Sequence, residues 1–251
     1  MKILGVIPAR YASTRFPGKP LALISGKPMI QHVYEKVSAT AIINYATVAT
    51  DDKRIFDAVI SFGGNAIMTS SSHPNGTSRC HETVNILENK NMHFDAVINI
   101  QGDEPFIKPR QIELVAKQFR NQDIQIATLA KKLENQDELF SPNVVKVVFD
   151  NNFKALYFSR NPVPFVRNKD KQEWMKNHTF YKHIGIYGFR KDILKKLTRL
   201  PESKLEKAEN LEQLRWIENG YSINLEITDM ESFGIDTPED LTKLTNNSWK
   251  F

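Results

Sequence analysis

The feature that most constrains the fold is an alternation of short apolar runs with amphipathic segments through the first half of the chain. The apolar runs, which have the length and character of buried strands, lie at 3–7, 45–49, 66–68 and 95–100. The amphipathic segments, in which apolar residues recur at helical spacing, lie at 29–37, 55–62, 80–87 and 112–119. Such an alternation predicts a mainly parallel sheet with helices on both faces. Sheets of this kind bind ligands at the carboxyl ends of their strands.

The second half of the chain has a different pattern. Two β-type runs, 144–149 and 155–158, are separated by Asp150-Asn151-Asn152, a composition typical of turns, so they predict a hairpin. Further predicted elements are a solvated loop at 167–177, strands at 184–189 and 221–227, and helices at 205–217 and 238–244. Because no linker separates the two halves, the sequence predicts one three-layer α/β domain over 1–251. Its sheet would be mixed but mainly parallel, with the hairpin as an excursion.

Composition narrows the class of protein. The 251 residues carry 34 Lys and Arg against 29 Asp and Glu, a formal net charge of +5. This suits an anionic partner, but no helix carries a basic stripe interleaved with aromatic residues, so we expect no nucleic-acid partner. The single cysteine, Cys80, excludes an internal disulfide. No apolar run reaches the roughly 18 residues of a membrane span. The apolar segment at the N-terminus ends at Pro8, so it is too short for the hydrophobic core of a signal peptide. We therefore expect a soluble, cytoplasmic protein without membrane insertion.

The loop after the first predicted strand is the most informative segment. Residues 7–21 read IPARYASTRFPGKPL, which places the cations Arg10, Arg15 and Lys19 beyond the carboxyl end of a strand. With the backbone N–H groups of a tight loop, such side chains can surround a polyphosphate. The alternative is a surface loop whose charges are merely solvated. The segment matches neither a Walker loop nor a Gly-x-Gly-x-x-Gly turn, which argues against a Rossmann dehydrogenase.

Two aspartates stand where a carboxylate serves either local structure or metal binding. Asp103 follows the strand predicted at 95–100, and Asp236 precedes Thr237 and the last predicted helix. Taken singly, each is more typical of a turn or a helix cap. Taken together, two carboxylates from separate strand ends can hold Mg²⁺ against phosphate oxygens. No His/Cys cluster of zinc type competes with this interpretation.

The segment 7–21 closely resembles the N-terminal signature of the bacterial 3-deoxy-manno-octulosonate cytidylyltransferases, also called CMP-Kdo synthetases. The likeness continues in order through nearly the whole chain, in GKPMI at 26–30, ATD at 49–51, QGDEP at 101–105, ALYFSR at 155–160, HIGIYG at 183–188, LEQLR at 211–215 and DTPEDL at 236–241. The resemblance implies a fold of the nucleotide-diphospho-sugar transferase type. It also implies transfer of CMP from CTP to 3-deoxy-D-manno-octulosonate (Kdo), with release of diphosphate, for lipopolysaccharide biosynthesis.

The resemblance assigns roles to the residues around the triphosphate. Its catalytic set is Arg10, Lys19, Asp103 and Asp236. The two cations would neutralise phosphate charge, and the two aspartates would ligate a catalytic Mg²⁺, with a second Mg²⁺ arriving with CTP. Arg15 either joins the cations or pairs locally. The residues that the resemblance assigns to the nucleotide are Pro8, Ala9, Arg10, Arg15, Lys19, Gly76, Arg79 and Asp103.

The resemblance places sugar recognition mainly in the second half of the chain. A guanidinium suits the Kdo carboxylate by bidentate pairing, which is the role of Arg160. His183 and Tyr187 share one face of their predicted strand because side chains alternate. A core or surface histidine is the alternative for His183, as a solvated acid is for Glu212. The residues that the resemblance assigns to the sugar are Gln101, Arg160, His183, Tyr187, Glu212 and Gln213.

One segment departs from the family pattern. Within 73–79, Asn75 stands where serine is common, and Ser78 where an acid is common. The rival functions are transfer to a modified sugar such as 8-amino-Kdo, and a catalytically silent nucleotide-binding relative. Glu104 matches the ordinary Kdo pattern, and the presence of both aspartates argues against a silent relative. The family implies a homodimer formed by the hairpin and the segments after it. We accordingly expect residues 1–130 to bind mainly CTP, and residues 131–251 to bind the sugar and form the dimer.

Overall fold

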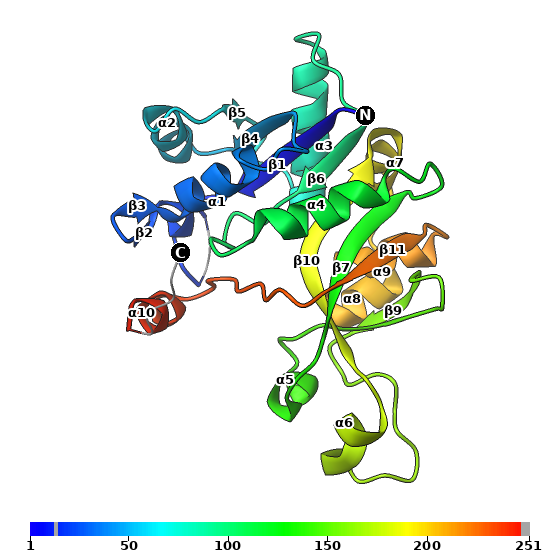
Figure 1. Ribbon diagram of the computed structural model, residues 1–251. Helices are drawn as coiled ribbons and strands as arrows, with labels where there is room; N and C mark the ends of the chain where they lie inside the picture. The colour runs from blue at the N-terminus through cyan, green and yellow to red at the C-terminus, as the bar shows by residue number, and fades with distance from the viewer. Residues whose placement is uncertain (13–14, 247–251) are drawn as a thin grey trace.

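A mixed sheet organises the molecule in the computed structural model, which describes residues 1–12 and 15–246. In this part of the chain nine strands form one sheet, seven of them in the order β11-β7-β10-β6-β1-β4-β5 (Figure 1). These seven strands are β1 (Ile3–Ala9), β4 (Tyr45–Thr50), β5 (Ala66–Met68), β6 (Ala96–Asn99), β7 (Ile126–Lys132), β10 (Tyr181–Arg190) and β11 (Ile223–Thr228). The pairs β1–β4, β1–β6, β4–β5 and β7–β11 are parallel, whereas β10 runs antiparallel to both its neighbours. The predicted sheet type is confirmed.

Helices cover both faces of the sheet. They are α1 (Met29–Ser38), α2 (Lys53–Ser61), α3 (Gly76–Glu88), α4 (Pro109–Gln118), α5 (Gln136–Phe140), α6 (Trp174–Asn177), α7 (Lys191–Leu197), α8 (Lys204–Glu209), α9 (Glu212–Glu218) and α10 (Pro238–Asn246). Two short 3-10 turns lie at Lys19–Leu21 and Lys171–Glu173, and β2 (Leu23–Ile24) pairs with β3 (Lys27–Pro28) in a small separate ribbon. Among these helices none has both the length and the apolar character needed to cross a bilayer.

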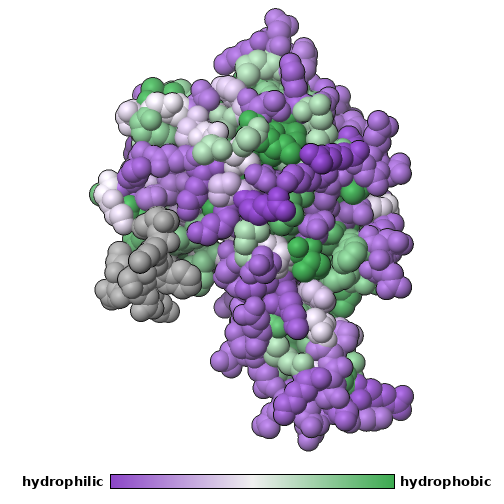
Figure 2. Space-filling view, viewed as in Figure 1, coloured by the Kyte–Doolittle hydropathy of each residue, from purple (hydrophilic) through white to green (hydrophobic). Residues whose placement is uncertain are grey.

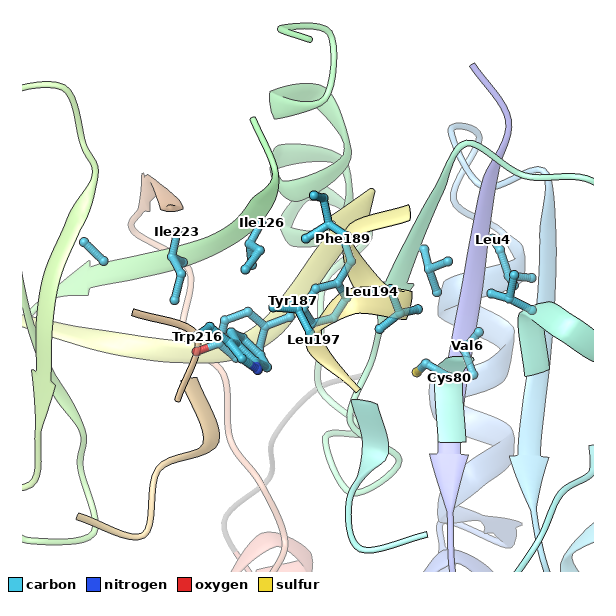
Figure 3. Packing of buried hydrophobic residues seen from close by; sticks show 14 of the residues in the cluster. Leu4, Val6, Cys80, Ile126, Tyr187, Phe189, Leu194, Leu197, Trp216 and Ile223 are labelled. Carbon is cyan, nitrogen blue, oxygen red and sulfur yellow. The ribbon is translucent and has the colours of Figure 1, made fainter. Parts of the chain in front are cut away.

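The core has two main layers, because side chains alternate along each strand. On β1, Leu4 and Val6 face the cluster formed with α3, α7 and α9, part of which is shown in Figure 3. Ile3 and Ile7 face the opposite cluster, formed with α1, α2 and α4. The predicted three-layer arrangement is therefore confirmed, and the first-half strands and helices fall where the sequence predicts them.

The hairpin is also present as predicted. Strands β8 (Lys146–Phe149) and β9 (Ala155–Ser159) pair antiparallel, and β8 joins the main sheet through β10. The turn is shaped by Asp150, whose carboxylate accepts hydrogen bonds from the backbone N–H groups of Asn152 and Lys154, at 2.8 and 2.9 Å. Beyond the hairpin, α5 and α6 form an arm that extends from the body, and its visible surface is mostly hydrophilic (Figures 1 and 2).

The structure corrects two predictions in the second half. The helix predicted at 205–217 is two helices, α8 and α9, because Asn210 adopts the left-handed conformation with φ 51° and ends the first of them. The loop predicted at 167–177 contains α6, and Trp174 is buried there against Phe180 and Leu139. Strand β7, which was not predicted from the sequence, lies between β11 and β10 in the sheet.

Candidate active site

The loop that follows β1 turns back sharply and delivers a lysine to the strand ends. Gly18 has φ +73°, and its backbone N–H donates to the Tyr11 carbonyl at 2.9 Å. A Cβ at Gly18 would lie 3.0 Å from the Tyr11 ring, so glycine is required both by the backbone conformation and by the available space. The turn leads directly into the 3-10 turn that begins with Lys19.

Lys19 lies between the two aspartates that the sequence analysis singles out. Its ammonium is 2.6 Å from Asp103 Oδ2 and 3.3 Å from Asp236 Oδ1, although these residues are 84 and 217 positions away in sequence. The Lys19 side chain is only 13% exposed. Arg15 Nη1 lies 3.2 Å from Asp236 Oδ2 and extends the cluster toward solvent. The structure thus brings the cationic loop and both carboxylates to one place.

Asp236 does not serve as a helix cap. The N-terminus of α10 is capped instead by Thr237, whose Oγ1 accepts a hydrogen bond from the backbone N–H of Asp240 at 3.3 Å. Asp240 Oδ2 in turn accepts hydrogen bonds from the backbone N–H groups of Asp236 and Thr237, at 3.1 and 3.0 Å. Because the capping is supplied by these neighbours, the Asp236 carboxylate faces Lys19 and Arg15.

A cavity of about 370 Å³ opens beside this cluster. Its lining includes every residue that the sequence analysis assigns to the nucleotide, namely Pro8, Ala9, Arg10, Arg15, Lys19, Gly76, Arg79 and Asp103. Asp236 and the sugar candidate Gln101 line it as well. The cavity therefore combines several cations with two carboxylates, and it lies at the carboxyl ends of β1 and β6.

Arg79 lines the cavity, and its guanidinium is fixed by contacts with Thr69 and Asp51. Nη1 donates to Thr69 Oγ1 at 2.6 Å, and Nη2 lies 3.4 Å from Asp51 Oδ1. Only 4% of the residue is exposed. Arg79 is therefore anchored to residues that follow β4 and β5, and it contributes positive potential to the cavity from a fixed position.

The remaining sugar candidates lie outside this cavity lining. His183 is held near the Thr128 hydroxyl at 3.0 Å and packs edge-on against Phe158, with ring centroids 5.1 Å apart. Burial lowers the pKa of His183 to about 3, so its ring is neutral near pH 7. The neighbouring Tyr187 hydroxyl is buried without a hydrogen-bond partner among the described residues, and burial raises its pKa. Gln213 is also buried.

Gln101 connects the cavity to the strand that carries these residues. Its side-chain amide donates to the Gly185 carbonyl on β10 at 3.1 Å. Gly185 lies between His183 and Tyr187 in sequence, and a Cβ there would be 3.5 Å from a Glu104 carboxylate oxygen. The cavity and the sugar candidates on β10 are therefore adjacent parts of one region.

Glu212 is held by the first turn of α3. Its Oε1 accepts a hydrogen bond from Asn75 Nδ2, and its Oε2 one from Thr77 Oγ1, both at 2.9 Å. Burial raises the pKa of Glu212 to about 7, while the hydrogen bond from Thr77 opposes that shift. The family resemblance assigns Glu212 to the sugar, and no local pattern in the sequence signals this contact with the 73–79 segment.

Arg160 is engaged by the backbone rather than directed to the cavity. Its guanidinium donates to the carbonyls of Glu209, Pro142 and Asn210, at 2.7, 3.0 and 3.3 Å. The carbonyl of Arg160 accepts from the buried Lys146 ammonium at 2.5 Å. Bidentate pairing with a ligand carboxylate would require Arg160 to give up some of these bonds.

Sequence reasoning missed the segment that fixes Asp236. Glu231 pairs with Lys131 at 2.8 Å and with Lys182 at 2.6 Å, and Ser232 donates to the partly buried Glu104 carboxylate. Three residues before the start of α10, Ile235 N–H donates to the Asp103 carbonyl at 2.9 Å. These contacts tie the extended chain after β11 to the sheet edge, and no periodic pattern in the sequence signals them.

The fold and the cavity together define the class of protein, an α/β nucleotidyltransferase. The solved structure of a 4-diphosphocytidyl-2C-methyl-D-erythritol synthase from Anaerococcus prevotii shares this fold, with a TM-score of 0.58 at 14% identity over 98% of this chain and 97% of that one. A family model described as cytidylyltransferase matches residues 4–227.

Closer relatives narrow the class to a family. A 3-deoxy-manno-octulosonate cytidylyltransferase from Parabacteroides distasonis is 53% identical over 97% of this chain and 96% of its own length. The solved structure of a CMP:2-keto-3-deoxy-manno-octonic acid synthetase complexed with CTP has a TM-score of 0.89 and 43% identity, and covers 98% of both chains. This chain belongs to the cytidylyltransferases and, among them, to the 3-deoxy-manno-octulosonate cytidylyltransferase family, as its sequence motifs predict.

Proposed function

We propose that this protein transfers CMP from CTP to Kdo, giving CMP-Kdo and diphosphate for lipopolysaccharide biosynthesis. The observation that carries the proposal is the convergence of Lys19, Asp103 and Asp236 beside a cavity lined by the family's nucleotide motif. Membership of the family supplies the substrates, because the relatives carry this activity in their names.

The reaction needs charge neutralisation and alignment more than a covalent protein group. The anomeric hydroxyl of Kdo attacks the α-phosphorus of CTP in line with the departing diphosphate, while the phosphates and the sugar carboxylate repel each other. Arg10 and Lys19 line the cavity and are the cations we assign to the triphosphate. The Lys19 ammonium pairs with both aspartates, so a bound triphosphate would compete with these carboxylates for it.

The donor set of the site fits a hard cation. Asp103 and Asp236 present carboxylate oxygens to one shared point, now taken by the Lys19 ammonium, and these are the ligands that Mg²⁺ prefers. We propose that these aspartates hold a catalytic Mg²⁺, with a second Mg²⁺ arriving with CTP. When bound, the metal would offset phosphate charge and lower the pKa of the attacking hydroxyl.

The sugar half of the proposal uses Gln101, which follows β6, and residues on β10, α9 and the hairpin. Gln101, Tyr187, Glu212 and Gln213 are proposed to bind Kdo hydroxyls, with the neutral His183 beside them. The buried Tyr187 hydroxyl, which has no hydrogen-bond partner among the described residues, supports this assignment, because a polar atom without a partner costs free energy unless a ligand or water satisfies it. Arg160 remains the proposed partner of the Kdo carboxylate, with the rearrangement noted above.

We further propose a cytoplasmic homodimer built on the hairpin and the arm. Large apolar side chains are exposed in this part of the described chain, with Leu156 at 56% and Phe165 at 73%. A cavity of about 650 Å³ also opens between β8 and the chain around α6. Exposed apolar side chains beside such a cavity favour a protein partner.

A diphosphate-release assay tests the proposed function. The purified protein is given CTP and Mg²⁺ with Kdo, 8-amino-Kdo and other acidic sugars in turn, and UTP and ATP replace CTP in parallel reactions. We expect release with CTP and Kdo well above every other pair. Preference for 8-amino-Kdo would reassign the sugar, and no release with any acidic sugar would refute the proposal.

A further inference from the structure

The amide of Asn75 makes two hydrogen bonds in opposite directions. Its Oδ1 accepts from the Ser78 backbone N–H at 2.9 Å and so caps α3. Its Nδ2 donates to Glu212 Oε1 at 2.9 Å, and Thr77 donates to the other carboxylate oxygen. The first turn of α3 therefore grips both oxygens of a carboxylate that belongs to α9, some 135 positions away in sequence.

These hydrogen bonds to Glu212 lie between the two proposed substrate sites. Asn75 lines the cavity assigned to the nucleotide, next to Gly76. Glu212 is among the residues assigned to the sugar, and it influences the hydroxyl of Tyr187 electrostatically. A displacement of the first turn of α3 at the nucleotide end would therefore move the hydrogen-bond donors of Glu212 at the sugar end.

We propose that Asn75 and Thr77 are positioning residues for Glu212, which hold and orient the carboxylate that meets the sugar and so couple the two substrate sites through α3. The role of Glu212 toward the sugar rests on the proposed function. The contacts themselves do not, and they can be tested in the ligand-free protein.

A substitution at Asn75 can remove its hydrogen bond to Glu212 while keeping its cap of α3. Serine is as good an N-cap as asparagine. The serine side chain is shorter and lacks the amide nitrogen that donates to Glu212. Asn75→Ser therefore keeps the cap of α3 and removes the hydrogen bond to Glu212. Thr77→Val removes the other donor with little change of shape, and Thr77 does not line the cavity.

The pKa of Glu212 depends on its hydrogen bonds with Asn75 and Thr77. Two neutral donors stabilise its ionised form, so loss of either raises its pKa further above the ordinary value. The other titratable or charged groups facing it are the Cys80 thiol from α3, Tyr187 from β10, Arg215 from α9 and Glu206 from α8. Arg215 is itself paired with Glu206 at 2.5 Å, and neither variant changes that pair.

The experiment measures the pKa of Glu212 and the two Michaelis constants in the same variants. Carboxyl resonances of ¹³C-glutamate-labelled, ligand-free protein are titrated by NMR, with Glu212→Gln to assign the signal. We expect Asn75→Ser and Thr77→Val each to raise the Glu212 pKa by about one unit. In the diphosphate assay at pH 7 we expect the KM for Kdo to rise roughly three- to tenfold in Thr77→Val, with the KM for CTP changed by less than about twofold. The matched control is Thr83→Val, a fully buried threonine on the same helix whose hydroxyl donates to the Arg79 carbonyl instead.

Every outcome bears on the proposal. An unchanged Glu212 pKa in both variants overturns it, as does an equal rise of the KM for Kdo in Thr83→Val. In the Glu212→Gln background, Thr77→Val should have little further effect on the KM for Kdo, and a full additional effect would show that Thr77 acts elsewhere. Wild-type protein that is inactive with Kdo would refute the proposed function. The NMR titration would still decide whether Asn75 and Thr77 hold Glu212.

Discussion

Replacing Asp236 by asparagine separates the stability of the site from its chemistry. The Asp236 side chain is 49% exposed, and it pairs with Lys19 at 3.3 Å and with Arg15 at 3.2 Å. Ion pairs this exposed contribute at most about 1 kcal/mol to stability, and the isosteric amide can still accept hydrogen bonds. We therefore expect the variant to fold with a nearly unchanged Tm.

The effect on turnover should be far larger. A carboxylate that binds the proposed Mg²⁺ supports a charge stabilisation of several kcal/mol in the transition state. Loss of about 4 kcal/mol corresponds to a fall in kcat/KM of roughly 10³-fold. Raising the Mg²⁺ concentration should restore part of the activity, because the affinity for the cation is what the substitution weakens.

The assay is diphosphate release from CTP and Kdo over a range of Mg²⁺ concentrations, with the Tm measured in parallel. Asp57→Asn is the matched control, since it breaks a comparable exposed pair, Lys53–Asp57 at 2.7 Å, on the surface of α2. We expect this control to keep full activity. If Asp236→Asn retained more than a tenth of wild-type kcat/KM, the assignment of Asp236 to the metal would be wrong.

Three further outcomes are expected. Gly18→Ala should raise the KM for CTP and lower the Tm more than Gly26→Ala, because both glycines have positive φ but a Cβ at Gly26 meets nothing within 4 Å; equal effects would remove the steric argument. The pKa of His183 falls from 6.5 in the unfolded chain to about 3 in the fold, so the free energy of unfolding of the wild type should decrease below pH 6.5, by up to about 1.4 kcal/mol per pH unit. Measured by urea unfolding, His183→Gln should make this pH dependence shallower, and an unchanged dependence would contradict a neutral His183 ring. Leu156→Asp should convert the proposed dimer to monomer in light scattering, whereas Ile60→Asp, at a similarly exposed apolar residue, should not; a dimer that survives the first change would place the interface elsewhere.

Local pattern was sufficient for most of the first half. Periodicity alone locates the first strands and helices, since each buries a face whose spacing is written in the sequence. Periodicity does not identify β7, because Gln125 and Thr128 interrupt the apolar residues of 124–130 without a clear period; its pairing with β10 and β11 makes it a strand. It fails again at Asn210, where a single left-handed residue divides one amphipathic stretch into α8 and α9.

The candidate site was predictable to the extent that it sits on strand ends. The motif after β1 and the QGDEP motif after β6 follow parallel neighbours, and the carboxyl ends of parallel strands meet at one edge. Asp236 was harder, because its chain follows β11 at the far side of the sheet and returns by an extended segment. The salt bridges of Glu231 and the hydrogen bond of Ile235 bring it back, and such long-range contacts have no local signature.

The sequence by itself determined the family and most elements of the first half, and it singled out the cationic loop and the two aspartates that the fold brings together. These follow from side-chain chemistry and from spacing along the chain. Only the tertiary structure decided how those groups are used. It directed the Arg160 guanidinium to backbone carbonyls, left capping of α10 to Thr237, and placed Asn75 against Glu212. The physical reason is that a hydrogen bond forms with whichever partner packing brings within about 3 Å, and packing across the sheet depends on residues far apart in the chain.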